Sequence, residues 1–263
     1  MHTLTALYSY PIKSIQGISH QTCQVQDRGL ALDRRWMLID QKNNFITQRT
    51  EQRMALFRTH LHKNHIELEF EGEKTQVPLE RHSNSSIDVR IWNDSCMAYL
   101  VDTQLDSWFS SKLGKSCRLV YMPDSTKRLV EKVEHTSNHI TGFSDAYPFL
   151  IISEQSLEDL NSKLPNAISM KRFRPNLVIN ASQAFEEDSW KTIRVGEVIF
   201  DLIKPCKRCV LTTVNPETGE KGDEPLKTLS SYRKINNEIL LGQNAVQRNN
   251  GKIHIGAKIE ILA

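Results

Sequence analysis

Two cysteines, Cys206 and Cys209, form a C-x-x-C pair in the segment 204–219. A structural zinc site needs four ligands, and neither a second C-x-x-C nor a spaced pair of histidines accompanies this one. A thioredoxin-type pair lies at the N-terminus of a helix, whereas the β-branched residues 210–214 predict a strand. Both common interpretations of a C-x-x-C pair are therefore weakened.

Three cationic residues, Lys204, Lys207 and Arg208, surround these thiols. Nearby positive charges favour a thiolate, which is a soft ligand suited to a redox-active transition metal. The alternative is that both cysteines are small, buried apolar residues. The residues alone leave these two interpretations open.

Three further basic clusters stand at the ends of expected strands. They are Tyr10-Pro-Ile-Lys-Ser14, Asp33-Arg34-Arg35-Trp36 and Phe173-Arg174-Pro175-Asn176. Arg174 precedes a proline, which favours an extended backbone there. Charged side chains at strand ends often surround a concave site, and several together would form an anion pocket, whereas each alone is a solvated strand end.

Three histidines, His60, His62 and His65, lie close together in the sequence. Lys63-Asn64 is typical of a turn, so we expect surface residues of a hairpin rather than metal ligands. The sequence contains no Walker, Rossmann or G-x-S-x-G motif.

Short β-type segments dominate the chain. We expect strands over residues 4–10, 36–40, 45–48, 66–70, 87–91, 97–101, 176–180, 192–195, 198–203, 209–214, 239–245 and 258–262. The hairpin-like connections at Gln41-Lys-Asn-Asn44 and Lys63-Asn64 give a spacing that favours an antiparallel barrel or sandwich. Helices are expected between Asp102 and Gly114 and from Ser153 to Leu164, since each segment has an apolar stripe and a capping residue. The predicted fold class is mainly β with a few helices (α+β).

The polar segment 123–138 has no clear period, and we place a domain boundary near residue 122, between domains of residues 1–122 and 123–263. The 263 residues are 39% hydrophobic and 25% charged, as in a soluble globular protein. A formal net charge of +3 without a basic stripe argues against a nucleic-acid partner. Short apolar runs, an N-terminus unlike a signal peptide and five scattered cysteines predict no membrane partner and a cytoplasmic location.

Seven motifs, in order along the chain, resemble those of MOSC-domain proteins. They are Tyr10-Pro-Ile-Lys-Ser14, Asp33-Arg-Arg-Trp36, Ser144-Asp-Ala-Tyr-Pro-Phe149, Phe173-Arg-Pro-Asn176, Cys206-Lys-Arg-Cys209-Val-Leu-Thr-Thr-Val214, Glu224-Pro-Leu-Lys-Thr-Leu229 and Gly242-Gln-Asn244. The sequence is most similar to the branch that includes the mitochondrial amidoxime-reducing component. The resemblance implies an N-terminal, β-rich MOSC β-barrel domain followed by an antiparallel β-barrel MOSC domain.

The resemblance also implies an enzyme with a molybdenum cofactor (Mo-molybdopterin) that reduces N-hydroxylated small molecules such as amidoximes, hydroxylamines and N-hydroxylated bases. In that family the second cysteine of the pair ligates the metal, which makes Cys209 the ligand here. The cofactor-binding positions correspond to Lys13, Ser14, Arg34, Ala146, Tyr147, Arg174, Asn176, Lys207, Arg208 and Asn244. The chain departs from the family at four of these: small hydroxyl residues are usual in animal members at Ala146 and Tyr147, a small residue at Lys207, and a tyrosine can replace Asn244.

We further expect Asp145, beside the predicted pocket, to be a proton-handling group. Asp145 and the metal ligand Cys209 are the expected catalytic residues. The chain has no iron–sulfur motif, so electrons would come from a separate flavin, ferredoxin or haem protein. Lys127, Arg128 or Lys132 would attract that protein, unless they belong to a solvated loop. Two alternatives to a reductase are a carrier protein with a persulfide on Cys209 and a cofactor-binding module without turnover.

Overall fold

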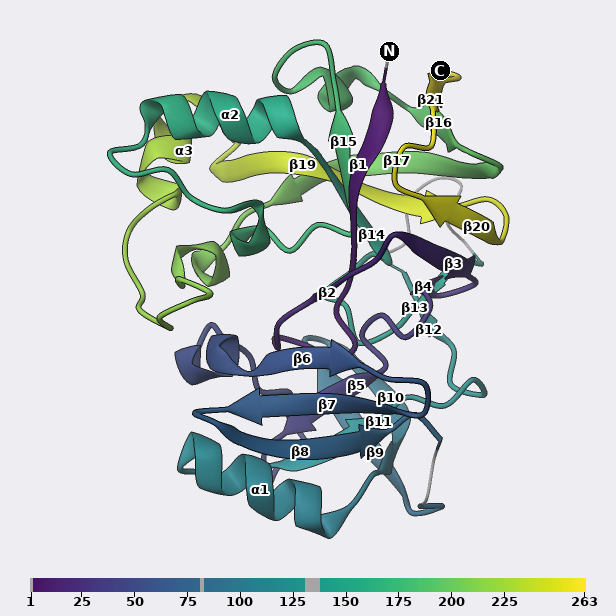
Figure 1. Ribbon diagram of the computed structural model, residues 1–263, viewed down its shortest axis with the longest axis vertical. Coiled ribbons are helices and arrows are strands. Elements are labelled where there is room, and N and C mark those ends of the chain that lie inside the picture. Colours follow the sequence, from purple (N-terminus) through teal and green to yellow (C-terminus); the bar gives the residue numbers. More distant parts are fainter. Residues whose placement is uncertain (1, 81–82, 131–137) are drawn as a thin grey trace.

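A large, mostly antiparallel sheet forms the upper part of the molecule (Figure 1). The computed structural model describes residues 2–80, 83–130 and 138–263. The strands of this sheet, in spatial order, are β2 (Ile18–Ser19), β1 (Thr3–Ser9), β15 (Leu177–Asn180), β14 (Phe149–Ser153), β19 (Glu238–Gln247), β17 (Val198–Lys207), β16 (Thr192–Val195) and β21 (Ile259–Ile261), with β18 (Lys234–Ile235) paired to β19. Strands β14 and β15 are parallel and their other neighbours are antiparallel.

The lower part holds two small antiparallel sheets and a helix (Figure 1). One sheet consists of β5 (Trp36–Ile39), β11 (Arg118–Tyr121), β10 (Asp94–Leu100) and β9 (Ser86–Ile91); the other consists of β6 (Arg58–Leu61), β7 (His65–Phe70) and β8 (Glu73–Pro78). Helix α1 (Thr103–Leu113) packs beside them. Smaller units are β20 (Gly251–His254) with β3 (Thr22–Gln26) and β4 (Gly29–Leu30), and β12 (Arg128–Leu129) with β13 (Ile140–Thr141). The predicted fold class, mainly β with a few helices, is confirmed.

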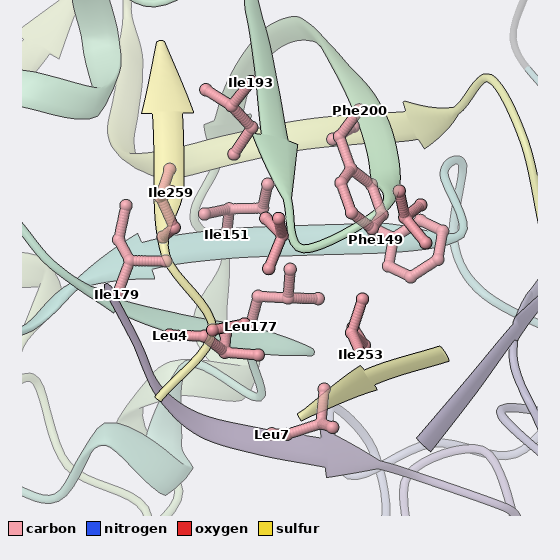
Figure 2. Packing of buried hydrophobic residues seen from close by; sticks show 14 of the residues in the cluster. Leu4, Leu7, Phe149, Ile151, Leu177, Ile179, Ile193, Phe200, Ile253 and Ile259 are labelled. Carbon is pink, nitrogen blue, oxygen red and sulfur yellow. The ribbon is translucent and has the colours of Figure 1, made fainter. Parts of the chain in front are cut away.

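Each part has its own apolar core. Figure 2 shows the upper core, in which Leu4 and Leu7 of β1 meet Ile151, Leu177 and Phe200 from later strands. The lower core is a separate apolar cluster. Its buried aromatic side chains are Trp36, Phe57, Phe70 and Phe109. Burial of this apolar surface is the main force that holds each part together.

Strands β1 to β4 belong to the upper part, although most of that part comes from later in the chain, and Ile12 and Ile15 between β1 and β2 pack in the lower core. Strand β1 pairs with β15, and β3 pairs with β20. The expected boundary near residue 122 falls between β11 and β12. That boundary remains a prediction, and the chain passes from the upper part to the lower part and back again.

Both expected helices are present and begin at the expected caps. Asp102 accepts a hydrogen bond from the Gln104 amide at the start of α1, and Gly114 ends that helix with a φ of 66°. The Ser153 side chain accepts a hydrogen bond from the Ser156 amide at the start of α2 (Glu154–Lys163). A third, short helix, α3 (Leu226–Tyr232), was not predicted because seven residues show little periodicity. None of the described helices combines the length and apolarity needed to cross a bilayer.

Two expected strands are wrong. Residues 210–213 form the 3₁₀ helix η4 (Val210–Thr213), because Thr212 and Thr213 donate side-chain hydrogen bonds back to the carbonyls of Cys209 and Val210. Within residues 45–48 a single isolated bridge, Phe45 to Ile39, replaces the strand, since the chain turns at Thr47, whose carbonyl accepts from two following amides. The other 3₁₀ helices are η1 (Gln52–Leu56), η2 (Met170–Arg172) and η3 (Glu186–Ser189).

The expected histidine hairpin is confirmed. His60 and His62 are exposed near the turn between β6 and β7, and the rings of His62 and His65 stack with their centroids 4.5 Å apart.

Glu187 is a fully buried carboxylate of η3 that forms hydrogen bonds to the start of α2. It accepts hydrogen bonds from the Ser153 amide and hydroxyl and from the Ser156 hydroxyl, at 3.1, 2.8 and 2.8 Å. Glu187→Ala is expected to lower the free energy of unfolding by about 1–3 kcal/mol, because these donors are left without an acceptor. Urea unfolding monitored by circular dichroism measures this change. The exposed Glu158→Ala is the control, and an equal effect of both substitutions would contradict the prediction.

Candidate cofactor site

A cavity of about 290 Å³ opens where the upper and lower parts meet. Segments far apart in the sequence contribute to its wall. The lining includes every site residue expected from the sequence: Cys209, Asp145, Lys13, Ser14, Arg34, Ala146, Tyr147, Arg174, Asn176, Lys207, Arg208 and Asn244. The fold therefore brings all of these residues to one place.

Neighbouring strand ends explain this convergence. The end of β1 lies beside the start of β15, and the start of β14 lies parallel to it, so the loops that carry Lys13, Arg174 and Asp145 leave the sheet at the same edge. Farther along the sheet, Lys204 of β17 pairs with Asn244 of β19. Cys209 lies two residues beyond the end of β17.

Three residues of the wall have a left-handed backbone conformation. The φ angles of Ser14, Arg34 and Arg174 are 65°, 48° and 55°. The extended conformation expected for Arg174 is wrong, because its amide closes a turn onto the Lys171 carbonyl and its guanidinium donates to the Ile15 carbonyl at 2.7 Å. Such conformations cost about 1–3 kcal/mol each and cluster at functional sites.

A buried tyrosine ring organises two of the arginines. The guanidinium carbons of Arg34 and Arg174 lie 4.4 and 4.2 Å from the Tyr10 ring centroid, and the Tyr10 hydroxyl donates to the Pro175 carbonyl. Burial lowers the pKa of Arg174 to about 10. Its Nη2 group is buried and has no hydrogen-bond partner within the described parts of the chain. One donor of this cation is thus left for a ligand.

Arg208, which lies between the two cysteines in the sequence, has a similar arrangement. It donates to the Cys206 sulfur at 3.1 Å and to the Phe173 carbonyl at 2.8 Å. Its buried Nε group, like Nη2 of Arg174, lacks a partner among the residues that the structure describes. Unsatisfied buried donors are rare in folded proteins, so these two indicate a missing acceptor.

Lys13 and Asp145 form an ion pair in the wall, with 2.7 Å between Nζ and Oδ1. Burial lowers the pKa of Lys13 to about 8, although Asp145 partly opposes this shift. Burial alone would raise the pKa of Asp145, but the charges of Lys13 and Arg49 outweigh it and hold that pKa well below its usual range. Asp145 therefore stays ionised near neutral pH, which argues against the proton-handling role expected for it. Lys13 is the group of this pair that can exchange a proton.

Arg49 is the residue that sequence reasoning missed. Its Nε lies 3.4 Å from the Cys209 sulfur, and its Nη2 donates to Asp145 at 2.5 Å. Burial lowers its pKa, but Asp145 and Cys209 more than compensate, so the pKa is raised. A basic residue directly after the expected strand 45–48 was the available signal, since the other three clusters were found by the same rule.

The lining carries a strong excess of positive charge. Among the described lining residues, seven are cationic and one is a carboxylate. The cationic residues are Lys13, Arg34, Arg49, Arg174, Lys204, Lys207 and Arg208, and the carboxylate is Asp145. Such an imbalance around a confined space favours an anionic ligand.

Lys127 and Arg128, which were expected to attract an electron-donor protein, differ in exposure. Arg128 is buried and donates to the carbonyls of Gly142, Ser144 and Asp145, so its interpretation as a surface charge for a partner is wrong. Its side chain instead contacts the loop that carries Asp145, which the sequence pattern does not reveal. Lys127 is exposed, and Lys132 lies outside the described residues.

Models of two protein domains match this chain. The MOSC N-terminal beta barrel domain matches residues 1–116, and the MOSC domain matches residues 138–260. The chain belongs to the MOSC-domain family. This confirms the resemblance expected from the seven motifs.

Relatives of this MOSC-domain protein extend over most of its length. Mitochondrial amidoxime reducing component 2 of Rattus norvegicus is 36% identical over 244 residues, which cover 88% of this chain and 72% of the relative. Mitochondrial amidoxime-reducing component 1 of Mus musculus is 33% identical over 280 residues, with 99% and 82% covered. Molybdenum cofactor sulfurase of Oryza sativa subsp. japonica is 32% identical over 261 residues, which cover 91% of this chain but 32% of that larger protein.

Proposed function

We propose that this MOSC-domain protein binds a molybdenum cofactor through Cys209 and reduces N-hydroxylated small molecules. The observation that carries the proposal is the Cys209 sulfur in the wall of a cavity with seven cationic side chains and one carboxylate. A thiolate is a suitable soft ligand for the metal, and the cations suit the phosphate and dithiolene groups of the pterin. The names of the rat and mouse relatives support the choice of amidoximes as substrates.

The residues present fit this cofactor. Buried donors on Arg174 and Arg208 lack partners in the described chain, and an anionic group beside them would supply the acceptors. Arg34 is already held by Asp33 at 2.7 Å and by Asn176 at 3.1 Å, so its guanidinium is oriented before any ligand arrives. Preorganised donors bind an anion with little further loss of side-chain entropy.

The protein's own part in the reaction is to bind, orient and supply a proton. When bound, the cofactor supplies the two-electron chemistry that removes oxygen from the N–O group. Arg34, Arg174 and Arg208 hold its anionic groups, and Lys13 holds a proton at Nζ near neutral pH because its pKa is about 8. Asp145 is an ionised carboxylate and orients Lys13 and Arg49 through its two ion pairs. Electrons come from a separate flavin, ferredoxin or haem protein. The location of the protein in the cytoplasm remains a prediction.

Elemental analysis tests the cofactor assignment. The protein is expressed in cells that make the molybdenum cofactor and in cells that cannot, and molybdenum per chain is measured in both. We expect metal only from the first cells, together with reduction of an amidoxime by a chemical reductant. A metal-free protein that carries sulfane sulfur would favour the persulfide carrier instead, and metal without reduction of any N-hydroxylated compound would favour a binding module.

The lowered pKa of Lys13 predicts how stability depends on pH. The pKa is about 8 in the folded protein against 10.5 for an ordinary lysine. Between these values the unfolded chain holds a proton that the folded chain has released, so raising the pH favours folding. Relative to Lys13→Met, the wild type is therefore expected to gain stability as the pH rises from about 7.5 to about 10. Urea midpoints of both proteins measure this difference, and a constant difference across the range would refute it.

A further inference from the structure

The Arg49 side chain extends from the lower part of the molecule into the cavity. Arg49 lies between β5 and η1, yet its guanidinium contacts Cys209 and Asp145, 160 and 96 positions away in the sequence. The side chain is largely buried, with 17% of its surface exposed. The lower part therefore contributes a side chain to the wall of the site.

Both ends of the Arg49 guanidinium are engaged at once. Nε points to the Cys209 sulfur at 3.4 Å and Nη2 to Asp145 Oδ2 at 2.5 Å. The planar fork of an arginine allows two such bonds in fixed directions, whereas the ammonium group of a lysine acts as a point charge. The geometry thus uses a property specific to arginine.

Trp92 holds this guanidinium from a second strand connection of the lower part. The Arg49 guanidinium carbon lies 4.9 Å from the Trp92 ring centroid, and the indole Nε1 donates to Asp145 Oδ1 at 3.3 Å. Trp92 has a left-handed backbone, with a φ of 53°, and is 48% exposed. A half-exposed indole in a strained conformation is explained by its contact with the Arg49–Asp145 pair.

We propose that Arg49 is a positioning residue that orients the Cys209 sulfur and tunes its donation to the metal, an inference that rests on the proposed function. A hydrogen bond to a ligating sulfur withdraws electron density from it and makes the metal easier to reduce. Asp145 and Trp92 fix the direction of that bond. The N-terminal MOSC part of the chain thereby adjusts a site whose metal ligand comes from the C-terminal MOSC part.

A purely structural role makes a different prediction. If Arg49 served only as an ion-pair partner of Asp145, a lysine at that position would replace it, because the charge would remain. If Arg49 acts on the sulfur, Arg49→Lys retains the charge but loses the directed N–H group. The pair of hypotheses is therefore separated by one conservative substitution.

The experiment compares wild type, Arg49→Lys and Arg53→Lys after expression in cells that make the cofactor. Arg53→Lys is the matched control, since Arg53 lies four residues away, pairs with Glu71 at 3.4 Å and contacts neither Cys209 nor Asp145. Three quantities are measured. They are the reduction potential of the metal, determined by electron paramagnetic resonance, the molybdenum retained after dialysis, and the unfolding temperature. We expect Arg49→Lys to shift the potential to more negative values and to lose molybdenum about 10- to 100-fold more readily. Its unfolding temperature should stay within roughly 4 °C of the wild type.

An unchanged potential and unchanged metal retention in Arg49→Lys would overturn the inference. The proposed function fails separately, if Cys209→Ser retains molybdenum as the wild type does. Should Arg49→Lys not fold, Trp92→Leu decides, because that exposed residue supports Arg49 without contacting the sulfur. A smaller shift in the same direction supports the inference, and a potential equal to that of the wild type rejects it.

Discussion

Replacing Cys209 with serine is expected to remove molybdenum from the protein and to abolish reduction of amidoximes. A serine hydroxyl stays protonated at neutral pH and is a hard donor, so it is a poor substitute for a soft thiolate. Loss of a direct ligand should exceed the roughly 10- to 100-fold effect typical of residues behind the ligands. Metal analysis and turnover with a chemical reductant, measured on the same sample, report both losses.

Cys206→Ser is the matched control for this substitution. Cys206 also lines the cavity, and its sulfur accepts a hydrogen bond from Arg208 at 3.1 Å. A serine oxygen can accept that bond as well, so Cys206→Ser should retain most of the metal. Loss of molybdenum in Cys206→Ser with full retention in Cys209→Ser would move the ligand to Cys206.

Arg174→Met is expected to have the second largest effect, on binding of the cofactor. Arg174 is a buried cation whose Nη2 group has no partner in the described structure, and methionine fills similar volume without charge. Truncating one partner of a buried charged pair costs about 2–5 kcal/mol, which is a roughly 30- to 5000-fold loss of affinity. The fraction of purified protein that carries molybdenum and pterin, the latter measured by fluorescence after oxidation, shows this loss.

Arg194→Met controls for the loss of one positive charge. Arg194 lies on β16, pairs with Glu260 at 2.9 Å and does not line the cavity. Because a surface ion pair contributes about 0–1 kcal/mol, this variant should bind the cofactor normally. Equal cofactor content in both variants would show that Arg174 is not a cofactor ligand.

Local sequence patterns determined the two longer helices, α1 and α2, and most of the strands. Asp102 and Ser153 cap their helices as expected, since a cap depends on residues only a few positions apart. The basic residues at strand ends could also be predicted locally, because charged residues directly follow or precede short apolar segments there. The cations around Cys206 and Cys209 indicated a possible thiolate ligand, but only the resemblance to MOSC-domain proteins selected Cys209.

Tertiary structure alone decided how these residues meet. No local pattern indicates that Arg49 reaches Cys209 across 160 positions, or that Arg128 is buried beneath the loop of Asp145. The left-handed turn at Arg174 depends on a carbonyl at Ile15, on a strand connection 159 residues earlier. Residue types set which contacts are chemically possible, but a contact between distant segments depends on the packing of the whole chain, and no single segment carries that information.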